Sequence, residues 1–256
     1  MNAYKGIGLM SGSSLDGLDI AYCAFTQESE KWSYKILKAE TIAFDERWAR
    51  RLANLAGQPA EAFARTDVFF GHWMGKAAKG FIQKNNIEPQ FVASHGQTIF
   101  HQPDNRFTSQ IGDGESIVSY LNCPVVTNFR NKNLAMGGQG APLVPFGEQK
   151  LFRDHDYFLN LGGISNLSSG NLAFDVSPCN MVLNRLAGMV DENCKYDENG
   201  MMARGGEVKT DLLEAIDTAA PAPPLTSLSV TDDPNAAGEP AACRRTTLNG
   251  QFIDGA

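Results

Sequence analysis

The stretch Gly12-Ser13-Ser14-Leu15-Asp16-Gly17-Leu18-Asp19 lies between two apolar runs, 7–10 and 20–25. This pattern predicts a strand, a tight polar turn and a second strand. The turn carries glycines, hydroxyls and carboxylates together, which is more polar chemistry than a hairpin needs. Glycines let a ligand approach the backbone and let N–H groups point at an oxyanion, while a carboxylate can hold a hydrated cation. A surface turn made of ordinary turn-forming residues is the competing interpretation.

A similar unit recurs in the second half of the chain. The apolar residues 157–161 lead into Gly162-Gly163, and an apolar run resumes at Ile164. Two strand–glycine-turn–strand units predict a duplicated fold with one phosphate loop in each half. Coincidence is the alternative, because glycine-rich hairpins are common.

The remaining pattern alternates strands with helices, which favours an α/β fold. The predicted strands are a pair at 34–37 and 41–44, one at 91–94 that runs into His95-Gly96-Gln97-Thr98, and one at 124–128. The predicted helices are 46–56, one or two amphipathic helices within 60–85, 115–121 and 145–151.

Asp175 follows the apolar residues 172–174 and precedes Ser177 and Pro178. Serine is a good helix N-cap and proline suits the first helical position, so we expect a helix to start there. This places Asp175 at a strand end facing a helix N-terminus, a common position for catalytic carboxylates in open α/β sheets. A carboxylate that only caps the helix is the alternative, and the local sequence favours it.

Composition excludes several classes of protein. The chain has 256 residues, 43% of them hydrophobic, and a formal charge of −7, which argues against a nucleic-acid-binding surface. The five cysteines are scattered without a CxxC pair, so neither a disulfide framework nor a zinc site is indicated, and a reducing cytoplasm is expected. No signal peptide and no membrane-spanning run are predicted. The tail from residue 218 is rich in alanine and proline, and we expect it to be irregular.

Seven motifs then occur in a specific order: GLMSGSSLDGLD, ASHGQT, QIGDG, TNFR, GGQGAPLVP, LNLGGISN and FDVSPCN. In this order they resemble the 1,6-anhydro-N-acetylmuramic acid kinases, from about residue 5 to about residue 215. That family belongs to the sugar kinase, actin and Hsp70 superfamily, whose members have two RNase H-like domains. The resemblance implies an actin-like α/β fold with a complete first domain (1–128), a partial second domain (129–217) and a tail (218–256).

The resemblance also implies a reaction. Water opens the anhydro bridge of the sugar, and ATP phosphorylates the freed O6 to give N-acetylmuramic acid 6-phosphate during cell-wall recycling. It implies that Asp175 is the general base that takes a proton from the water. Residues 12–19 would form one ATP phosphate loop, with Gly162 and Gly163 in the other. Asp16 would hold Mg²⁺ through water.

On the sugar side, the resemblance places Arg130 at the position of an arginine that contacts the substrate, where its planar fork suits the lactyl carboxylate. Without the family, a surface ion pair is an equally good interpretation of Arg130. Gln97 and Thr98 match a strand-end motif that lines the sugar pocket, and His95 could belong to it. Asp113 is the second choice for the base. The expected partners are the sugar and ATP, with no nucleic acid and no membrane; a homodimer is left open.

Two departures from the family pattern matter. Val176, Ser177 and Cys179 stand where the family has Thr and two Gly, so we expect altered geometry around Asp175. The resemblance also stops near Ile216, and an alanine- and proline-rich stretch follows, as a frameshift or rearrangement would produce. We therefore expect a truncated, weak or inactive kinase. The alternatives are a remnant that binds only sugar or nucleotide, and a related kinase for another sugar.

Overall fold

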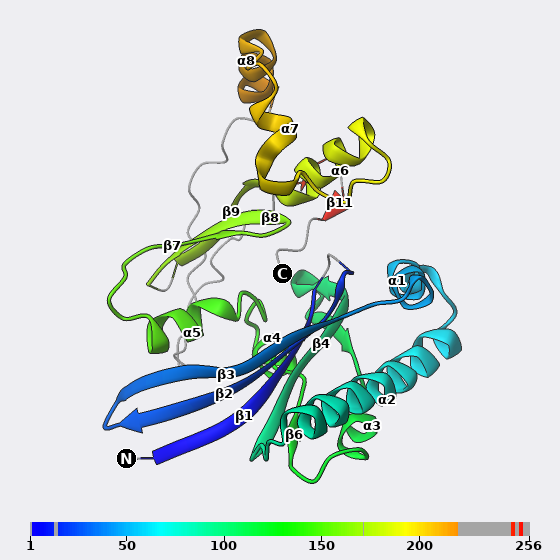
Figure 1. The fold of residues 1–256 in the computed structure, drawn as a ribbon, viewed down its shortest axis with the longest axis vertical. Coiled ribbons are helices and arrows are strands. Elements are labelled where there is room, and N and C mark those ends of the chain that lie inside the picture. The colour runs from blue at the N-terminus through cyan, green and yellow to red at the C-terminus, as the bar shows by residue number, and fades with distance from the viewer. Residues whose placement is uncertain (1, 13–14, 171, 220–246, 249–250, 253–256) are drawn as a thin grey trace. The chain divides into compact units, whose positions relative to one another are not determined.

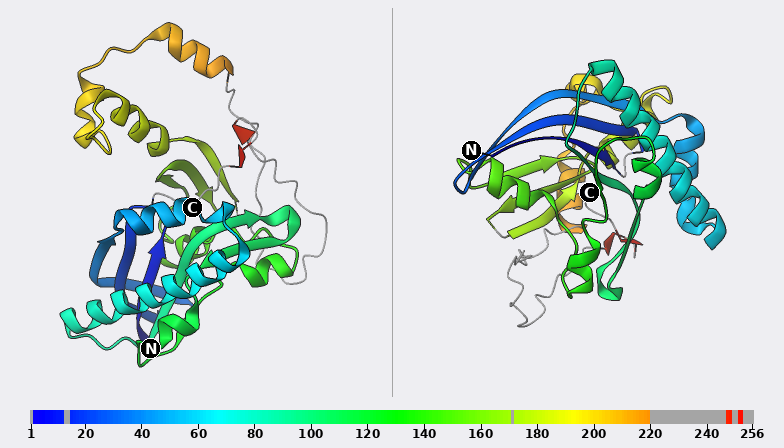
Figure 2. Two further views of the ribbon diagram at one scale, coloured as in Figure 1. Left: turned by 90° about the vertical axis from the view of Figure 1, so that its right-hand side faces the viewer. Right: turned by 90° about the horizontal axis from the view of Figure 1, so that it is seen from below.

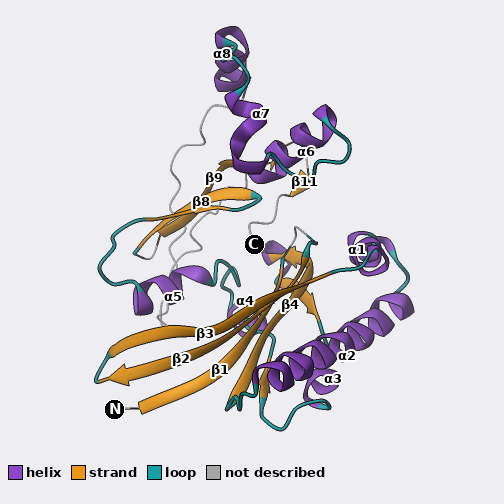
Figure 3. Ribbon diagram, viewed as in Figure 1, coloured by secondary structure: helices purple, strands orange, loops and turns teal. Residues whose placement is uncertain are grey.

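The computed structural model describes residues 2–12, 15–170, 172–219, 247–248 and 251–252. The chain divides into two compact units, 1–143 and 144–256, and each is described here by itself (Figure 1). Each unit combines a sheet with helices, so the described part of the chain is α/β (Figure 3). None of the helices in the described ranges is long and apolar enough to cross a membrane.

The sheet of the first unit has the strand order β3-β2-β1-β4-β5, and β6 also pairs with β4. The first three strands form an antiparallel meander, β1 runs parallel to β4, and β4 runs antiparallel to β5. Figure 2 shows the meander as a long curved ribbon. The strands are β1 (Asn2–Ser11), β2 (Gly17–Glu28), β3 (Lys31–Ala43), β4 (Phe91–Gln102), β5 (Phe107–Ile111) and β6 (Val125–Val126).

The alternating apolar residues of β1 and β2 build the core of this unit. Ile7 and Leu9 on β1 are buried beside Leu18 and Ile20 on β2, while Asp19 between the latter two is exposed. A period of two turns every second side chain to one face of a sheet. The polar turn 12–19 therefore connects two central strands whose apolar side chains are buried on one face of the sheet.

The prediction of two strands at 34–37 and 41–44 was wrong. A single strand, β3, pairs with β2 along its full length, from Gly17 opposite Ala43 to Glu28 opposite Lys31. The polar residues between the two predicted strands stay in the ladder because β2 supplies hydrogen-bond partners for them. One bulge absorbs the break in the apolar pattern, where Tyr22 and Cys23 face Lys38 and Ile36.

Helices cover the first sheet, and α2 is the principal one. Its buried residues, among them Phe70, Met74, Ala78 and Phe81, recur at helical spacing and pack against the core strands. The spacing of apolar residues predicted one or two helices within 60–85, and the structure has one. The helical elements are α1 (Glu46–Ala53), η1 (Leu55–Gly57), α2 (Ala60–Asn85), η2 (Pro103–Asn105), α3 (Gly114–Val118) and α4 (Asn131–Ala135).

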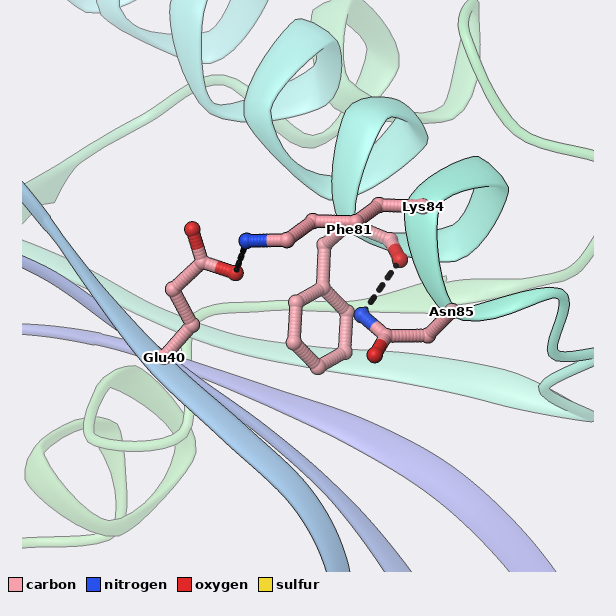
Figure 4. A network of polar contacts seen from close by, with 4 residues as sticks. All are labelled: Glu40, Phe81, Lys84 and Asn85. Carbon is pink, nitrogen blue, oxygen red and sulfur yellow. Dashed lines mark hydrogen bonds and ion pairs between the residues drawn. The ribbon is translucent and has the colours of Figure 1, made fainter.

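Two glycines of α2 allow α3 to approach closely. A Cβ on Gly71 would lie 2.5 Å from the carbonyl oxygen of Asp113, and one on Gly75 would lie 2.6 Å from the Tyr120 ring. At the C-terminal end of α2, Lys84 Nζ lies 2.8 Å from Glu40 Oε2 on β3, and Asn85 donates to the carbonyl of Phe81 within the helix (Figure 4). Close packing in the middle of α2 thus brings α3 near, and the contact of Lys84 with Glu40 joins the end of α2 to β3.

The second unit has an antiparallel sheet in the order β7-β8-β9. Helix α5 is tied to this sheet, because Gln149 Nε2 donates to the carbonyl of Gly170 and Ser168 Oγ donates to Glu148. The elements are α5 (Val144–Leu151), β7 (Phe158–Leu161), β8 (Ile164–Ser169), β9 (Leu172–Pro178), α6 (Asn180–Val190), η3 (Glu198–Gly200), α7 (Met201–Arg204), α8 (Thr210–Ala219), β10 (Thr247–Leu248) and β11 (Gln251–Phe252).

The predicted helix start at Ser177 and Pro178 was wrong. Strand β9 continues to Pro178, which lies opposite Ile164 of β8, and α6 begins at Asn180 after Cys179 as its N-cap. Proline fits a strand end because its missing N–H costs the ladder little there. Most of the tail from 218 lies outside the described residues. Of those that are described, 218 and 219 end α8, and β10 pairs with β11, so the expectation of an irregular tail was wrong at these positions.

Candidate functional site

The turn between β1 and β2 is closed by backbone bonds. Leu15 has a φ of 54° and donates its N–H to the carbonyl of Gly12. Asp16 accepts, through its carbonyl, from the N–H of Phe44 beyond β3. Gly17 is needed for packing, because a Cβ there would lie 2.5 Å from the carbonyl oxygen of Ile42. The glycines and bonds of this turn hold its position relative to the neighbouring strands.

The side chains predicted for the first phosphate loop fall into three groups. Ser13 and Ser14 lie outside the described residues. Leu18 is fully buried in the core and Leu15 packs against it, so these two side chains serve packing. The carboxylates of Asp16 and Asp19 are exposed, and Asp19 accepts a hydrogen bond from Thr41 Oγ1.

A bulge in β4 lies beside this turn. Leu9 faces Ser94, but the next pair is Ser11 with Gln97, so His95 and Gly96 bulge out of the ladder. The side chains of Ser11 and Gln97 are buried, and Ser11 Oγ donates to Gln97 Oε1 at 2.5 Å. Gln97 and Thr98, which the sequence groups in one motif, thus lie on the strand adjacent to the predicted phosphate loop. Bulges of this kind re-aim side chains, often near active sites.

Arg130 is buried, with 6% of its surface exposed, immediately before α4. Its Nη1 donates to the carbonyl of Gly140 at 2.9 Å, while Nε and Nη2 lie 3.1 and 2.9 Å from His95 Nε2. The interpretation as a surface ion pair therefore does not hold. Burial and the nearby guanidinium lower the pKa of His95 from its ordinary value of 6.5, because both disfavour the imidazolium.

Asp113, the second choice for the general base, caps α3. Its Oδ2 accepts from the backbone N–H and the hydroxyl of Ser116, at 2.7 and 2.6 Å. Asp67 of α2 accepts from the N–H of Gly112 next to it, and burial raises the pKa of Asp67 above its ordinary value. Asp113 therefore acts as the N-cap of α3, and its carboxylate has a structural role there.

In the second unit, the glycine loop between β7 and β8 contacts the start of α6. The carbonyl of Gly162 accepts from the N–H of Asn180, and that of Gly163 accepts from the N–H groups of Cys179 and Met181. Asn180 Nδ2 donates to the carbonyl of Leu161. In a trans peptide the N–H points opposite to the C=O. The N–H groups of Gly162, Gly163 and Ile164 therefore point away from α6.

Asp175 lies within β9 on an exposed part of the strand, opposite Asn166. Ser165 faces Ser177, so Val176 is the extra residue of a bulge next to Asp175. Asp175 is thus part of the strand and precedes α6 by several residues, with its orientation set by the bulge. The first N–H groups of α6 are bonded to the glycine loop, so Asp175 does not cap this helix.

The predicted site residues therefore gather in two groups, one in each unit. Gln97, Thr98 and Arg130 belong to the first unit together with the turn 12–19, and Asp175 belongs to the second with the loop of Gly162 and Gly163. Ser11 and Asn133 were not predicted from the sequence. Asn133 Oδ1 accepts from the N–H of Gly140 at 2.7 Å and so orients the loop that meets Arg130. The sequence signal for this role is that Asn133 lies four residues before Gly137, the first glycine of 137–140.

A comparison with protein families matches residues 4–226 to the model described as "Anhydro-N-acetylmuramic acid kinase". The chain belongs to this family. Among curated relatives named anhydro-N-acetylmuramic acid kinase, that of Pseudoalteromonas translucida is 33% identical over 236 residues, covering 82% of this chain and 59% of the relative. Those of Francisella tularensis subsp. novicida (33%, 84% and 62%) and Pseudomonas syringae pv. syringae (35%, 82% and 60%) are similar.

The chain spans about 60% of the length of the curated relatives it matches. The mixed sheet of the first unit agrees with the actin-like α/β fold that the family resemblance implies. Family membership therefore confirms the fold class and the recognition made from the seven motifs.

Proposed function

We propose that this protein is a kinase that opens 1,6-anhydro-N-acetylmuramic acid with water and transfers the γ-phosphoryl group of ATP to O6. The product is N-acetylmuramic acid 6-phosphate, as in cell-wall recycling. The observation that carries the proposal is the family match over residues 4–226, which includes every predicted site residue. The domain limits 1–128, 129–217 and 218–256 are part of this proposal.

Ring opening needs a base beside the anomeric carbon. In the proposed step a water oxygen bonds to C1, the C1–O6 bond breaks with its electron pair going to O6, and Asp175 takes the proton of the water. An exposed carboxylate on a bulged strand suits this role, because it can meet both water and substrate. The proton later leaves Asp175 for solvent, because O6 receives the phosphoryl group.

Phosphoryl transfer needs donors for the phosphate charge. The N–H groups of Gly162 and Gly163 point away from α6 and form one of the two proposed phosphate loops. The turn 12–19 is the other proposed loop, and the exposed carboxylate of Asp16 suits Mg²⁺, which needs only one or two carboxylates beside phosphate oxygens and water. When bound, Mg²⁺ would neutralise charge on the phosphates.

The sugar would be held by the first unit. Arg130 has a planar guanidinium that matches a carboxylate, and the muramic sugar carries a lactyl carboxylate that glucosamine sugars lack. Gln97 and Thr98 lie on the same strand as His95, which Arg130 contacts. This recognition distinguishes the proposal from a related kinase for another sugar.

The proposed setting is the cytoplasm, where scattered free thiols such as Cys23 and Cys123 fit a reducing environment. The proposed partners are the sugar and ATP, without nucleic acid, given the formal charge of −7. A homodimer stays a prediction.

One observation favours a second candidate, a protein that binds the sugar without turning it over. Leu183, Met189 and Val190 of α6 are more than half exposed, so within the described part of the chain these apolar side chains are not covered. A helix with little packing holds its neighbours less rigidly. The glycine loop that contacts α6 would then be a poor phosphate site.

The test is an assay of the purified 256-residue chain with ATP and the anhydro sugar, followed by mass analysis of the sugar phosphate. Asp175→Asn should lower kcat by roughly 10²–10⁴-fold, the usual contribution of a general base. Asp156→Asn, an exposed carboxylate of the same unit, is the matched control and should keep the wild-type rate. Sugar binding without product would support the second candidate, and equal rates for the two variants would refute the role of Asp175.

A further inference from the structure

Two donors of one guanidinium edge converge on a single nitrogen. Arg130 Nε and Nη2 lie 3.1 and 2.9 Å from Nε2 of His95. An arginine nitrogen can only donate, so Nε2 of His95 must be an unprotonated acceptor. The Nε/Nη2 edge of the guanidinium is thus bonded to the imidazole ring, and a substrate carboxylate would meet the Nη1/Nη2 end of the same plane.

The other ring nitrogen defines the state of His95. Nδ1 lies 3.0 Å from the carbonyl oxygen of Gly96, which can only accept, so Nδ1 carries the proton. His95 is therefore neutral with its hydrogen on Nδ1. A second proton on Nε2 would face two N–H donors and a positive charge, and Arg130 is the charged group that acts on this ring.

A third contact fixes the opposite side of the guanidinium. Arg130 Nη1 donates to the carbonyl of Gly140, whose N–H is in turn bonded to Asn133 Oδ1 at 2.7 Å. Gly140 has a φ of 69°, and a Cβ there would lie 2.9 Å from the Leu134 side chain. The bulge of β4 and the glycine loop 137–140 thus orient the buried cation between them.

We propose that His95 is a positioning residue that fixes the guanidinium of Arg130 in the orientation in which it meets the carboxylate of the substrate. The inference rests on the proposed function, because it takes the muramic sugar as the ligand of Arg130. His95 itself touches no reacting atom. Its bulged position on β4 links the strand that carries Gln97 and Thr98 to the arginine.

A purely structural role for His95 makes different predictions. If the ring only fills space, a phenyl ring should serve as well, and any loss should affect all ligands equally. If Nε2 positions Arg130, any hydrogen-bond acceptor at that place should suffice. The loss of affinity should then appear only for a ligand that carries a carboxylate. Gln places Oε1 near the position of the histidine Nε2, whereas Phe keeps the ring and removes the acceptor.

The experiment compares His95→Gln and His95→Phe in the full chain, with His155→Phe, an exposed histidine of the other unit, as control. Calorimetry measures binding of 1,6-anhydro-N-acetylmuramic acid and of 1,6-anhydro-N-acetylglucosamine, which lacks the lactyl carboxylate. In parallel, ¹⁵N NMR follows exchange of the Nε–H of Arg130, assigned with Arg130→Lys.

We expect His95→Phe to bind the muramic sugar roughly tenfold to a hundredfold more weakly, the usual loss for hydrogen bonds to a charged group. His95→Gln should stay within about threefold of wild type, a loss below that of a typical hydrogen bond. Affinity for the glucosamine sugar should be unchanged in both. The Nε–H of Arg130 should exchange faster in His95→Phe only.

Equal loss for both sugars, equal loss in both variants, or an unchanged Arg130 signal in His95→Phe would overturn the inference. If the wild type binds neither sugar, the proposed function fails instead, and the Arg130 signal alone then decides whether His95 fixes the guanidinium.

Discussion

Gly96 shows at the scale of one residue why the β4 bulge can form. Its φ is 72°, a conformation that side chains rarely adopt, and a Cβ would lie 2.3 Å from the carbonyl oxygen of Ile111. Both the backbone conformation and the neighbouring strand therefore require glycine here. The bulge holds His95, so this requirement also supports the position of Arg130.

Gly96→Ala should lower the free energy of unfolding by about 2 kcal/mol or more, from the left-handed conformation and the clash with a backbone atom. Urea denaturation measures this loss. Gly80→Ala is the control, because Gly80 lies on α2 with open space around its Cβ position and should gain about 0.5–1 kcal/mol. A neutral Gly96→Ala variant would contradict the structure of the bulge.

His95 gives the protein a specific pH dependence. Its pKa is lowered below 6.5 in the fold by burial and by Arg130, so between the two pKa values the unfolded chain binds more protons than the native one. The free energy of unfolding should therefore fall as the pH drops through 6.5 toward the native pKa. The slope from this one proton is at most about 1.4 kcal/mol per pH unit.

Urea titrations of wild type and His95→Gln between about pH 5 and pH 7.5 isolate this contribution, because other groups cancel in the difference. The difference in stability should favour wild type more at pH 7.5 than at pH 5. A difference that stays constant with pH would show that His95 titrates normally in the fold.

The family resemblance suggested Arg130 as a carboxylate ligand, but it did not indicate the contacts of this side chain. The sequence places Arg130, His95 and Gly140 in three separate motifs, and nothing local indicates that a buried guanidinium joins them. The contact depends on the bulge of β4 and the positive φ of Gly140, which are set by strand pairing and packing. Such contacts require the fold.

At the scale of elements, local patterns predicted helices well and boundaries poorly. The spacing of Phe70, Met74 and Phe81 predicts α2, because helical periodicity needs only one face to be buried. The start of α6 was missed because pairing with β8 extends β9 through Pro178. β5 was missed as well, since only its partner β4 makes a strand of residues 107–111.

The buried face of α2 also contributes to the stability of the first unit. Phe70 is fully buried among the rings of Phe44, Trp48 and Trp73. Phe70→Ala should cost about 3–5 kcal/mol, from lost burial and the cavity left behind. Val68→Ala, at a position 40% exposed on the same helix, should cost less than about 1 kcal/mol. Thermal or urea unfolding measures both, and similar losses would contradict the assigned face of α2.

At the scale of the whole molecule, the two units differ in how well they are packed. The large core cluster lies entirely in the first unit, whereas the buried apolar residues of the second, among those described, are Pro145, Ile164, Ala173 and Ala187. Apolar burial is the main source of stability. The first unit should therefore be the stable one.

Hydrogen exchange followed by mass spectrometry tests this difference. Peptides from β1, β2 and α2 should exchange only through global unfolding. Peptides from β8 and α6 should exchange at least about tenfold faster, through local opening. Equal protection in the two units would show that the second unit is as well packed as the first.

The central claim is that this chain opens the anhydro ring with water and phosphorylates O6. The most direct measurement is a reaction of the purified chain with ATP and the anhydro sugar in ¹⁸O-labelled water, followed at once by mass spectrometry. We predict a sugar phosphate with one heavy oxygen at C1 and unlabelled phosphate on O6, absent in Asp175→Asn. Unchanged sugar after prolonged incubation, or a product without the heavy oxygen, would contradict the account.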